Sequence, residues 1–146
     1  MLDNLFGIEL DVHTTLNVID ELRESEQLLV NQFVESKHLT VHTLEDLQLP
    51  PAIQNSKALS PSDKSVFSLA LKLDAIILSG DGIIRKTTWL KKIETHGTLW
   101  LLDQFVEKQL LQRQNAAVCL TRLITYDKKR LPIVECEKRI SVWAKS

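Results

Sequence analysis

A short, uninterrupted apolar run at residues 75–78 constrains the fold of this chain more than any other feature, and a turn-forming segment at 79–82 follows it directly. A strand with one solvent-facing side alternates apolar and polar residues, whereas a strand covered on both faces is apolar at every position. Strands of the second kind occur in parallel sheets that have helices packed on both faces. The run therefore predicts an α/β fold built on a parallel sheet.

Two other segments have the periodicity of strands. Residues 8–14 and 38–43 alternate between apolar and polar side chains, and the apolar residues between these segments recur at helical spacing with a break near Ser25. Strands that alternate with helices along the chain are typical of an open α/β sheet. We therefore expect a three-layer α/β/α domain, with residues 8–14, 38–43 and 75–79 in one mainly parallel sheet.

The other helices have recognisable start signals. Ser60, Pro61 and Asp63 have the spacing of a helix N-cap, a first-turn proline and the third-position acid of a capping box. A helix should therefore begin after Ser60. Three further helices are expected at about residues 98–110, directly after Gly97, 115–126 and 132–143.

Composition and length fit one globular domain over residues 1–146. Hydrophobic residues make up 44% of the chain and charged residues 25%, which is the ordinary globular balance. No apolar run reaches the roughly 18–20 residues that cross a bilayer, and the first residues lack the basic and apolar regions of a secretory signal. A cytoplasmic protein without a membrane partner is the expectation.

The net charge of −1 conceals an uneven distribution along the chain. Residues 1–63 contain eleven acids against three Lys or Arg, a balance of −8, and residues 64–146 contain eight acids against fifteen Lys or Arg, a balance of +7. A basic half can hold a phosphate backbone while an acidic half supplies metal ligands. Attraction between two sides of one domain explains the same pattern, and the sequence leaves both interpretations open.

Three acids have positions that allow a functional role. Asp81 follows the apolar run by three residues, and ligands of open α/β sheets bind outside the carboxyl ends of the strands. Asp81 also lies between two glycines, where Asp is an ordinary turn or capping residue. Asp63 is explained equally well by its capping box, and Glu21 by an exposed helix position. Taken singly, each position is ambiguous.

In their order along the chain, the segments that contain these acids resemble those of PIN-domain ribonucleases. Residues 14–22 are similar to the PIN segment in which a strand ends in Ser or Thr and the next helix presents a Glu. Residues 59–70 resemble the segment in which an Asp opens a helix, and residues 75–81 resemble the apolar strand that ends in Thr/Ser-x-Asp. Residues 84–86 and 96–99 look like a bacterial and archaeal branch that often occurs beside toxin–antitoxin genes.

The resemblance implies a metal-dependent endoribonuclease that acts on single-stranded RNA. Glu21, Asp63 and Asp81 would then be both the catalytic residues and the ligands of Mg²⁺ or Mn²⁺, and Ser79 would assist through its hydroxyl group. Carboxylates that converge in one cleft repel each other, and a divalent cation relieves that repulsion. The implied partners are RNA, an antitoxin protein if the chain is a toxin, and a second copy in a homodimer.

The N-terminus departs from the family pattern. PIN domains begin with a central strand that ends in an Asp, and Asp3-Asn4 imitates that ending. However, too few residues separate Asn4 from the strand expected at Ile8 to contain the crossover helix between parallel strands. Residues 2–6 therefore have the place of that helix's tail, and the first strand would be missing or replaced.

Because an acid would be lost with that strand, we expect weak or no activity from this chain, and more from a chain extended upstream by a strand ending in Asp. Two other interpretations stay open. The first is a catalytically degenerate PIN-like module that binds RNA or protein, and the second is a non-enzymatic α/β scaffolding domain. The four histidines, His13, His38, His42 and His96, have no ligand spacing and are expected at the surface or in ordinary hydrogen bonds.

Overall fold

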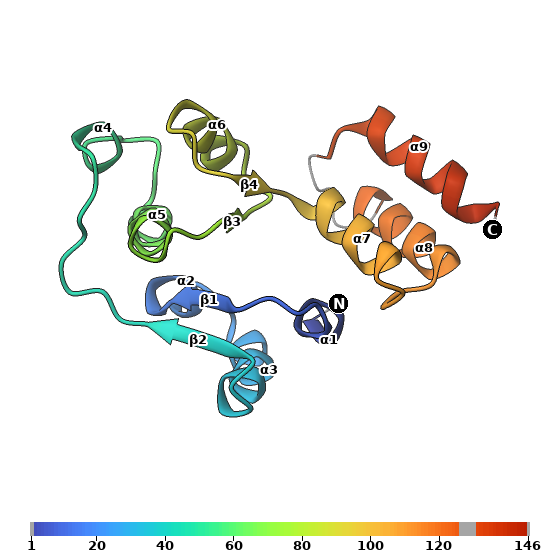
Figure 1. Cartoon of the computed structure of the whole chain (residues 1–146), viewed down its shortest axis with the longest axis horizontal. Coiled ribbons are helices and arrows are strands. Elements are labelled where there is room, and N and C mark those ends of the chain that lie inside the picture. The colour runs from blue at the N-terminus through green and yellow to red at the C-terminus, as the bar shows by residue number, and fades with distance from the viewer. Residues whose placement is uncertain (1, 126–130, 146) are drawn as a thin grey trace. The chain divides into compact units, whose positions relative to one another are not determined.

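The computed structural model describes residues 2–125 and 131–145, apart from the side chains of residues 2, 89 and 90, and these residues form two compact units (Figure 1). The strand unit comprises residues 9–98, and the helical unit comprises residues 1–8 and 99–146. The elements of the strand unit are β1 (Val12–Thr15), α2 (Leu16–Asp20), α3 (Glu24–Glu35), β2 (Leu39–His42), α4 (Pro51–Gln54), α5 (Pro61–Leu73), β3 (Ile77–Leu78), α6 (Gly82–Leu90) and β4 (Thr95–His96). Those of the helical unit are α1 (Leu2–Gly7), α7 (Thr98–Glu107), α8 (Arg113–Thr125) and α9 (Ile133–Ala144).

The strands of the strand unit form two parallel pairs. β1 pairs with β2 in a register that sets Val12 opposite Leu39, and β3 pairs with β4 in a register that sets Ile77 opposite Thr95. An α/β fold with parallel pairing is therefore confirmed. The prediction of one sheet over residues 8–14, 38–43 and 75–79 is wrong in detail, because the strands are shorter and the two pairs are separate. Within the described residues no strand joins β1 to β3.

The apolar run at residues 75–78 is covered less completely than predicted. Ile77 is 3% exposed, but Ile76 and Leu78 are each 37% exposed. The backbone N–H groups of Ile77 and Ser79 donate to carbonyl groups of the β4 segment. Because side chains alternate between the two faces of a strand, Ile76 and Leu78 lie on the face opposite to Ile77. That face is therefore the less completely covered of the two.

Helix α5 forms the centre of the strand unit. Phe67 is fully buried, and it belongs to a cluster drawn from α4, α5, β3, α6 and the segment before α5. The buried members of this cluster are Ile53, Leu59, Phe67, Ala70, Ile77 and Ile84. The same helix contacts α2, β1 and β3. Elements that are distant in the sequence are therefore held in place by one helix.

The break predicted near Ser25 separates α2 from α3. Thr15 caps the N-terminus of α2, and its hydroxyl oxygen accepts a hydrogen bond from the Val18 amide at 3.3 Å. The side-chain amide of Gln27, in α3, donates to the carbonyl groups of Ile19 and Leu22 at 3.1 and 3.0 Å. These bonds satisfy carbonyl groups at the end of α2, where no helical partner follows. The chain turns between the helices without leaving those acceptors unpaired.

The helical unit has its own core around Leu102, Phe105 and Leu120, all fully buried. Helices α7, α8 and α9 correspond to the predicted ranges, although the predicted last residue of the second, Tyr126, lies outside the described residues. Helix α1 corresponds to the helix tail expected at residues 2–6. None of the helices in the described ranges combines the length and the apolar composition that a membrane span requires.

Candidate acidic site

The first part of the candidate site is formed where β1 ends and α5 begins. Thr15, the last residue of β1, is fully buried, and its hydroxyl oxygen lies 2.7 Å from that of Ser65 in α5. The Ser65 hydroxyl donates its only hydrogen to the carbonyl oxygen of Ser62, at 2.6 Å. Thr15 is therefore the donor in its bond with Ser65. This chain of bonds fixes the carboxyl end of β1 against the first turns of α5.

Glu21 is attached to the same helix through Ser62. The hydroxyl of Ser62, a residue that is 7% exposed, donates to Glu21 Oε1 at 2.7 Å and approaches the carbonyl oxygen of Asn17 at 3.2 Å. The carboxylate of Glu21 is thus held beside the N-terminal turn of α5. Unpaired N–H groups at a helix N-terminus favour negative charge. Through this contact Glu21 is bonded to the residue that precedes Asp63.

Asp63 has the capping role that its spacing predicts. Its Oδ2 accepts a hydrogen bond from the Ser60 amide at 2.9 Å, and the Ser60 hydroxyl accepts one from the Asp63 amide at 3.1 Å. These reciprocal bonds are a capping box. One carboxylate oxygen of Asp63 is engaged in this way. Capping therefore accounts for an acid at position 63 without any chemistry, and it does not exclude a second role for the other oxygen.

Asp81 and Ser79 lie together after β3, at the start of α6. Asp81 Oδ1 accepts hydrogen bonds from the amides of Ile83 and Ile84, at 2.7 and 3.3 Å, so Asp81 also caps a helix. The Ser79 hydroxyl oxygen accepts from the Asp81 amide at 3.1 Å and keeps its own hydrogen to donate. Asp81 is exposed to solvent. Its position after the strand end is the predicted one.

The candidate residues have the chemistry of divalent-cation ligands, but the described structure does not group three of them around one position. Carboxylate oxygens are the ligands that Mg²⁺ prefers, and Glu21, Asp63 and Asp81 supply them. Yet over residues 2–125 and 131–145, no group of three or more His, Cys, Asp or Glu is placed to hold a metal ion. The contacts described above join Glu21 to the α5 N-terminus and Asp81 to α6. That all three acids share one ion stays a prediction.

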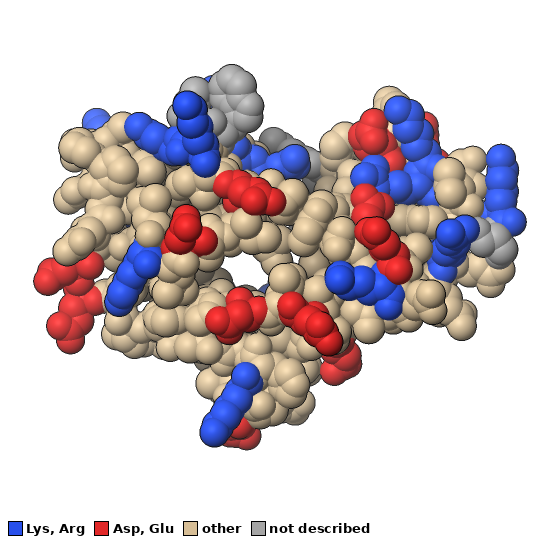
Figure 2. Space-filling view, in the orientation of Figure 1, with Lys and Arg blue, Asp and Glu red and all other residues tan. Residues whose placement is uncertain are grey.

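A basic side chain lies beside the Ser79–Asp81 turn. A Cβ atom placed on Gly97 would lie 3.5 Å from Arg85 Nη1 and 3.5 Å from the carbonyl oxygen of Ser79. Both are ordinary van der Waals distances, so the guanidinium group lies close to Gly97 without requiring a glycine there. On the face shown in Figure 2, acidic and basic side chains are interspersed within each unit. Arg85 and the Ser79 carbonyl group thus both lie near Gly97, which follows β4.

Sequence reasoning missed one association of titratable groups, that of His13 with His42. Their ring nitrogens Nδ1 and Nε2 lie 2.8 Å apart, and His13 Nε2 lies 2.9 Å from Asp11 Oδ2. Both histidines lie in the predicted strands, and the parallel pairing of β1 with β2 brings them together. Pairing of those two strands was the signal that could have revealed this contact. Chain spacing could not, because the residues are 29 positions apart.

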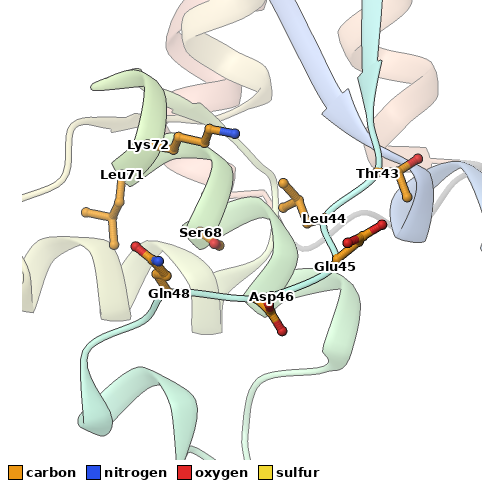
Figure 3. A pocket seen from close by; sticks show the side chains of 8 residues that line it. All are labelled: Thr43, Leu44, Glu45, Asp46, Gln48, Ser68, Leu71 and Lys72. Atoms are coloured by element: carbon orange, nitrogen blue, oxygen red, sulfur yellow. The ribbon is translucent and has the colours of Figure 1, made fainter.

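A surface hollow of about 460 Å³ also lies in the strand unit (Figure 3). Its lining comes from the segment after β2 and from α5. These residues are Thr43, Leu44, Glu45, Asp46, Gln48, Ser68, Leu71 and Lys72. Both carboxylates and the Lys72 ammonium line it, so neither sign of ligand charge is selected. Glu21, Asp63 and Asp81 are absent from this lining.

Parallel strand pairs joined by helices define an α/β protein, and acidic and hydroxyl side chains follow the ends of its strands. A family model described as a PIN domain matches residues 1–144. The chain therefore belongs to the PIN-domain family, which supports a nuclease-like class of function and the use of a divalent metal. No curated protein matches the sequence.

Proposed function

We propose that this chain is a PIN-domain ribonuclease for single-stranded RNA whose metal site is incomplete in the isolated chain. The observation that carries the proposal is the 2.7 Å bond from Ser62 to Glu21. That bond holds Glu21 beside the first turn of α5, which also contains Asp63, and the chain belongs to the PIN-domain family. An active cleft needs further convergent carboxylates, and the described residues contain no group of three. Weak activity follows from this deficit.

The expected loss can be stated in magnitude. Removing a partner of a metal site typically lowers metal affinity or activity about 10–100-fold. A site short of one direct ligand should lose at least that much. We therefore expect cleavage of single-stranded RNA in Mg²⁺ or Mn²⁺ to be slow or undetectable.

The experiment is a cleavage assay on a fluorescently labelled single-stranded RNA, with Mg²⁺, with Mn²⁺ and with EDTA. Asp63→Asn is the informative variant, because Asn retains an oxygen that can accept from the Ser60 amide while the charge is lost. Residual metal-dependent cleavage should fall further in Asp63→Asn and in Glu21→Gln. Leu28→Ala, at an exposed position of α3, is the matched control and should cleave like the parent chain. Cleavage that persists equally in EDTA and in both acid variants would refute the proposal.

A second candidate function, RNA binding without cleavage, is favoured by the capping roles of Asp63 and Asp81. Both acids have a sufficient structural explanation. Under this alternative, Arg85 beside Ser79 contacts phosphate groups. Arg85→Ala should then weaken RNA binding and reduce the slope of log affinity against log salt by about 0.7, the value for one contact to a single strand. Lys37→Ala, after α3, is the control and should change neither quantity.

The partners implied by the resemblance remain proposals of the same kind. We propose that the chain is the toxin of a toxin–antitoxin pair and that it forms a homodimer. Light scattering coupled to size-exclusion chromatography tests the second point directly, since a dimer has twice the 16.7 kDa mass of one chain. Arrest of cell growth on expression, relieved by a neighbouring gene, tests the first.

A further inference from the structure

The β1–β2 pair carries histidines on a face that a helix covers. The register sets His13 opposite Thr40 and Thr15 opposite His42. Because side chains alternate along a strand and paired positions share a face, His13, Thr15 and His42 lie on the same side. Thr15 bonds to Ser65 of α5 from that side. A covered face of a parallel pair is ordinarily apolar, so two neighbouring histidines there need an explanation.

The geometry assigns a direction to the hydrogen bonds of these rings. An ionised carboxylate only accepts, so Asp11 Oδ2, 2.9 Å from His13 Nε2, requires the hydrogen of His13 on that nitrogen. Neutral His13 then has a lone pair at Nδ1. His42 Nε2, 2.8 Å away, must be the donor in the bond between the rings. While both rings are neutral, the order of donation is therefore His42 to His13 to Asp11.

The same geometry limits how many protons the pair can hold. With one added proton, a charged ring donates to the lone pair of a neutral ring, and the bond persists. With two added protons, both facing nitrogens carry hydrogens, and no lone pair remains between them. The ring centroids are 5.1 Å apart, so two imidazolium charges would also repel each other at short range. The second proton must therefore break the contact.

The surroundings of His42 oppose its protonation. Burial lowers the pKa of His42, and the charges of His13 in β1 and Lys72 in α5 lower it further, while Asp11 raises it. Helix α3 also packs against β2, but among the described residues it contributes none of the charges that act on His42. The cation from α5 thus adds to the repulsion within the pair.

We propose that the hydrogen bond between His13 and His42 is a proton-sensitive lock that joins β1 to β2. The bond persists while the two rings hold at most one added proton, and the second added proton breaks it. The direction of the pH effect follows from linkage. In the unfolded chain His42 titrates near its ordinary value of 6.5. In the folded chain its pKa is lower, so below about pH 6.5 the unfolded state binds more protons and the free energy of unfolding falls. This inference does not depend on ribonuclease activity.

The first measurement is a titration of the histidine ring resonances by NMR in the folded full-length chain. We expect His42 to titrate below 6.5, and His13→Gln to shift its midpoint upward because a neighbouring positive charge is lost. At the basic end of the titration, the ring nitrogen shifts should report neutral His13 with its hydrogen on Nε2. A His42 midpoint at 6.5 that is unchanged in His13→Gln would overturn the proposal.

The second measurement is urea unfolding between pH 8.0 and 5.5. The midpoint of the parent chain should fall as the pH decreases, and His42→Gln should reduce that fall. His38→Gln, after α3 in the same unit, is the matched control and should retain the fall of the parent chain. If His42→Gln fails to fold, the NMR titration of the parent chain and of His13→Gln still decides the matter. An identical pH dependence in the parent chain and His42→Gln would contradict the lock.

Discussion

At the scale of single residues, two of the candidate acids serve as helix caps. Asp63 and Asp81 each use one carboxylate oxygen to accept from backbone amides at the start of α5 and α6. Glu21 uses one oxygen to accept from the Ser62 hydroxyl. Each carboxylate is therefore fixed in orientation by a bond that does not require a metal. A cation would have to bind the second carboxylate oxygen of each acid, which these hydrogen bonds do not use.

The cap of α5 gives a prediction about stability. Ser60→Ala removes the hydroxyl that accepts from the Asp63 amide. Loss of a serine N-cap costs about 0.5–2 kcal/mol, so the free energy of unfolding in urea should fall by about 1 kcal/mol. Ser25→Ala, at an exposed position in the first turn of α3, is the control and should stay within about 0.5 kcal/mol of the parent chain. Equal losses in both variants would show that the cap contributes nothing specific.

Local contacts at this scale were predictable, and distant ones were not. The capping box of Ser60 and Asp63 depends on a spacing of three residues, which is visible in the sequence. The bond from Ser62 to Glu21 joins residues 41 positions apart, and it depends on how α2 packs against α5. Packing of that kind is decided by tertiary structure, so the sequence could indicate the acids but not their neighbours.

At the scale of elements, α5 carries the packing of the strand unit. Phe67 is fully buried in α5, whereas Leu71, one turn later, is 44% exposed. Phe67→Ala should lower the free energy of unfolding by about 3–5 kcal/mol, since a large buried side chain is lost and a cavity remains. Leu71→Ala on the same helix should cost about 1 kcal/mol or less. Urea denaturation measures both, and similar losses would contradict the assignment of the core.

The helical unit supplies a second prediction at this scale. Arg139 in α9 makes a two-pronged contact with Asp103 in α7, with Nε to Oδ1 at 2.9 Å and Nη2 to Oδ2 at 2.7 Å. Because the Arg139 and Asp103 side chains are 25% and 38% exposed, solvent screens the pair. Asp103→Ala should therefore cost about 1 kcal/mol of unfolding free energy in urea. Glu137→Ala, exposed in α9, should cost less, and a reversed order would contradict the bond's role.

For the strands, the sequence predicted their positions in the chain but not how far their side chains are buried or how the strand pairs are arranged. The run at residues 75–78 correctly indicated a parallel strand, but its neighbours Ile76 and Leu78 proved accessible. Hydrophobicity reports what a strand can bury, whereas its actual burial depends on which elements pack on each of its faces. The described strands form two separate pairs, β1–β2 and β3–β4, and the periodicity of the sequence could not show that these pairs do not join.

At the scale of the whole molecule, the family match spans both units, whereas the candidate acids lie in one. The PIN-domain match covers residues 1–144. Glu21, Asp63, Asp81 and Ser79 all belong to the strand unit, residues 9–98. The order of the segments along the chain identified the family before any geometry was known. Whether the site is complete could not follow from that order, because convergence of carboxylates is a property of the folded chain.

The central claim is that the three acids of this chain do not by themselves form a strong metal site, and Mn²⁺ binding measured by calorimetry tests it most directly. We predict a dissociation constant of about a millimolar or weaker for the parent chain, the range of the weakest protein sites for a divalent cation. Asp63→Asn and Asp81→Asn, which can keep their capping bonds, are the comparison variants. Binding of Mn²⁺ at micromolar concentration that is lost in both variants would contradict the claim and show a complete site.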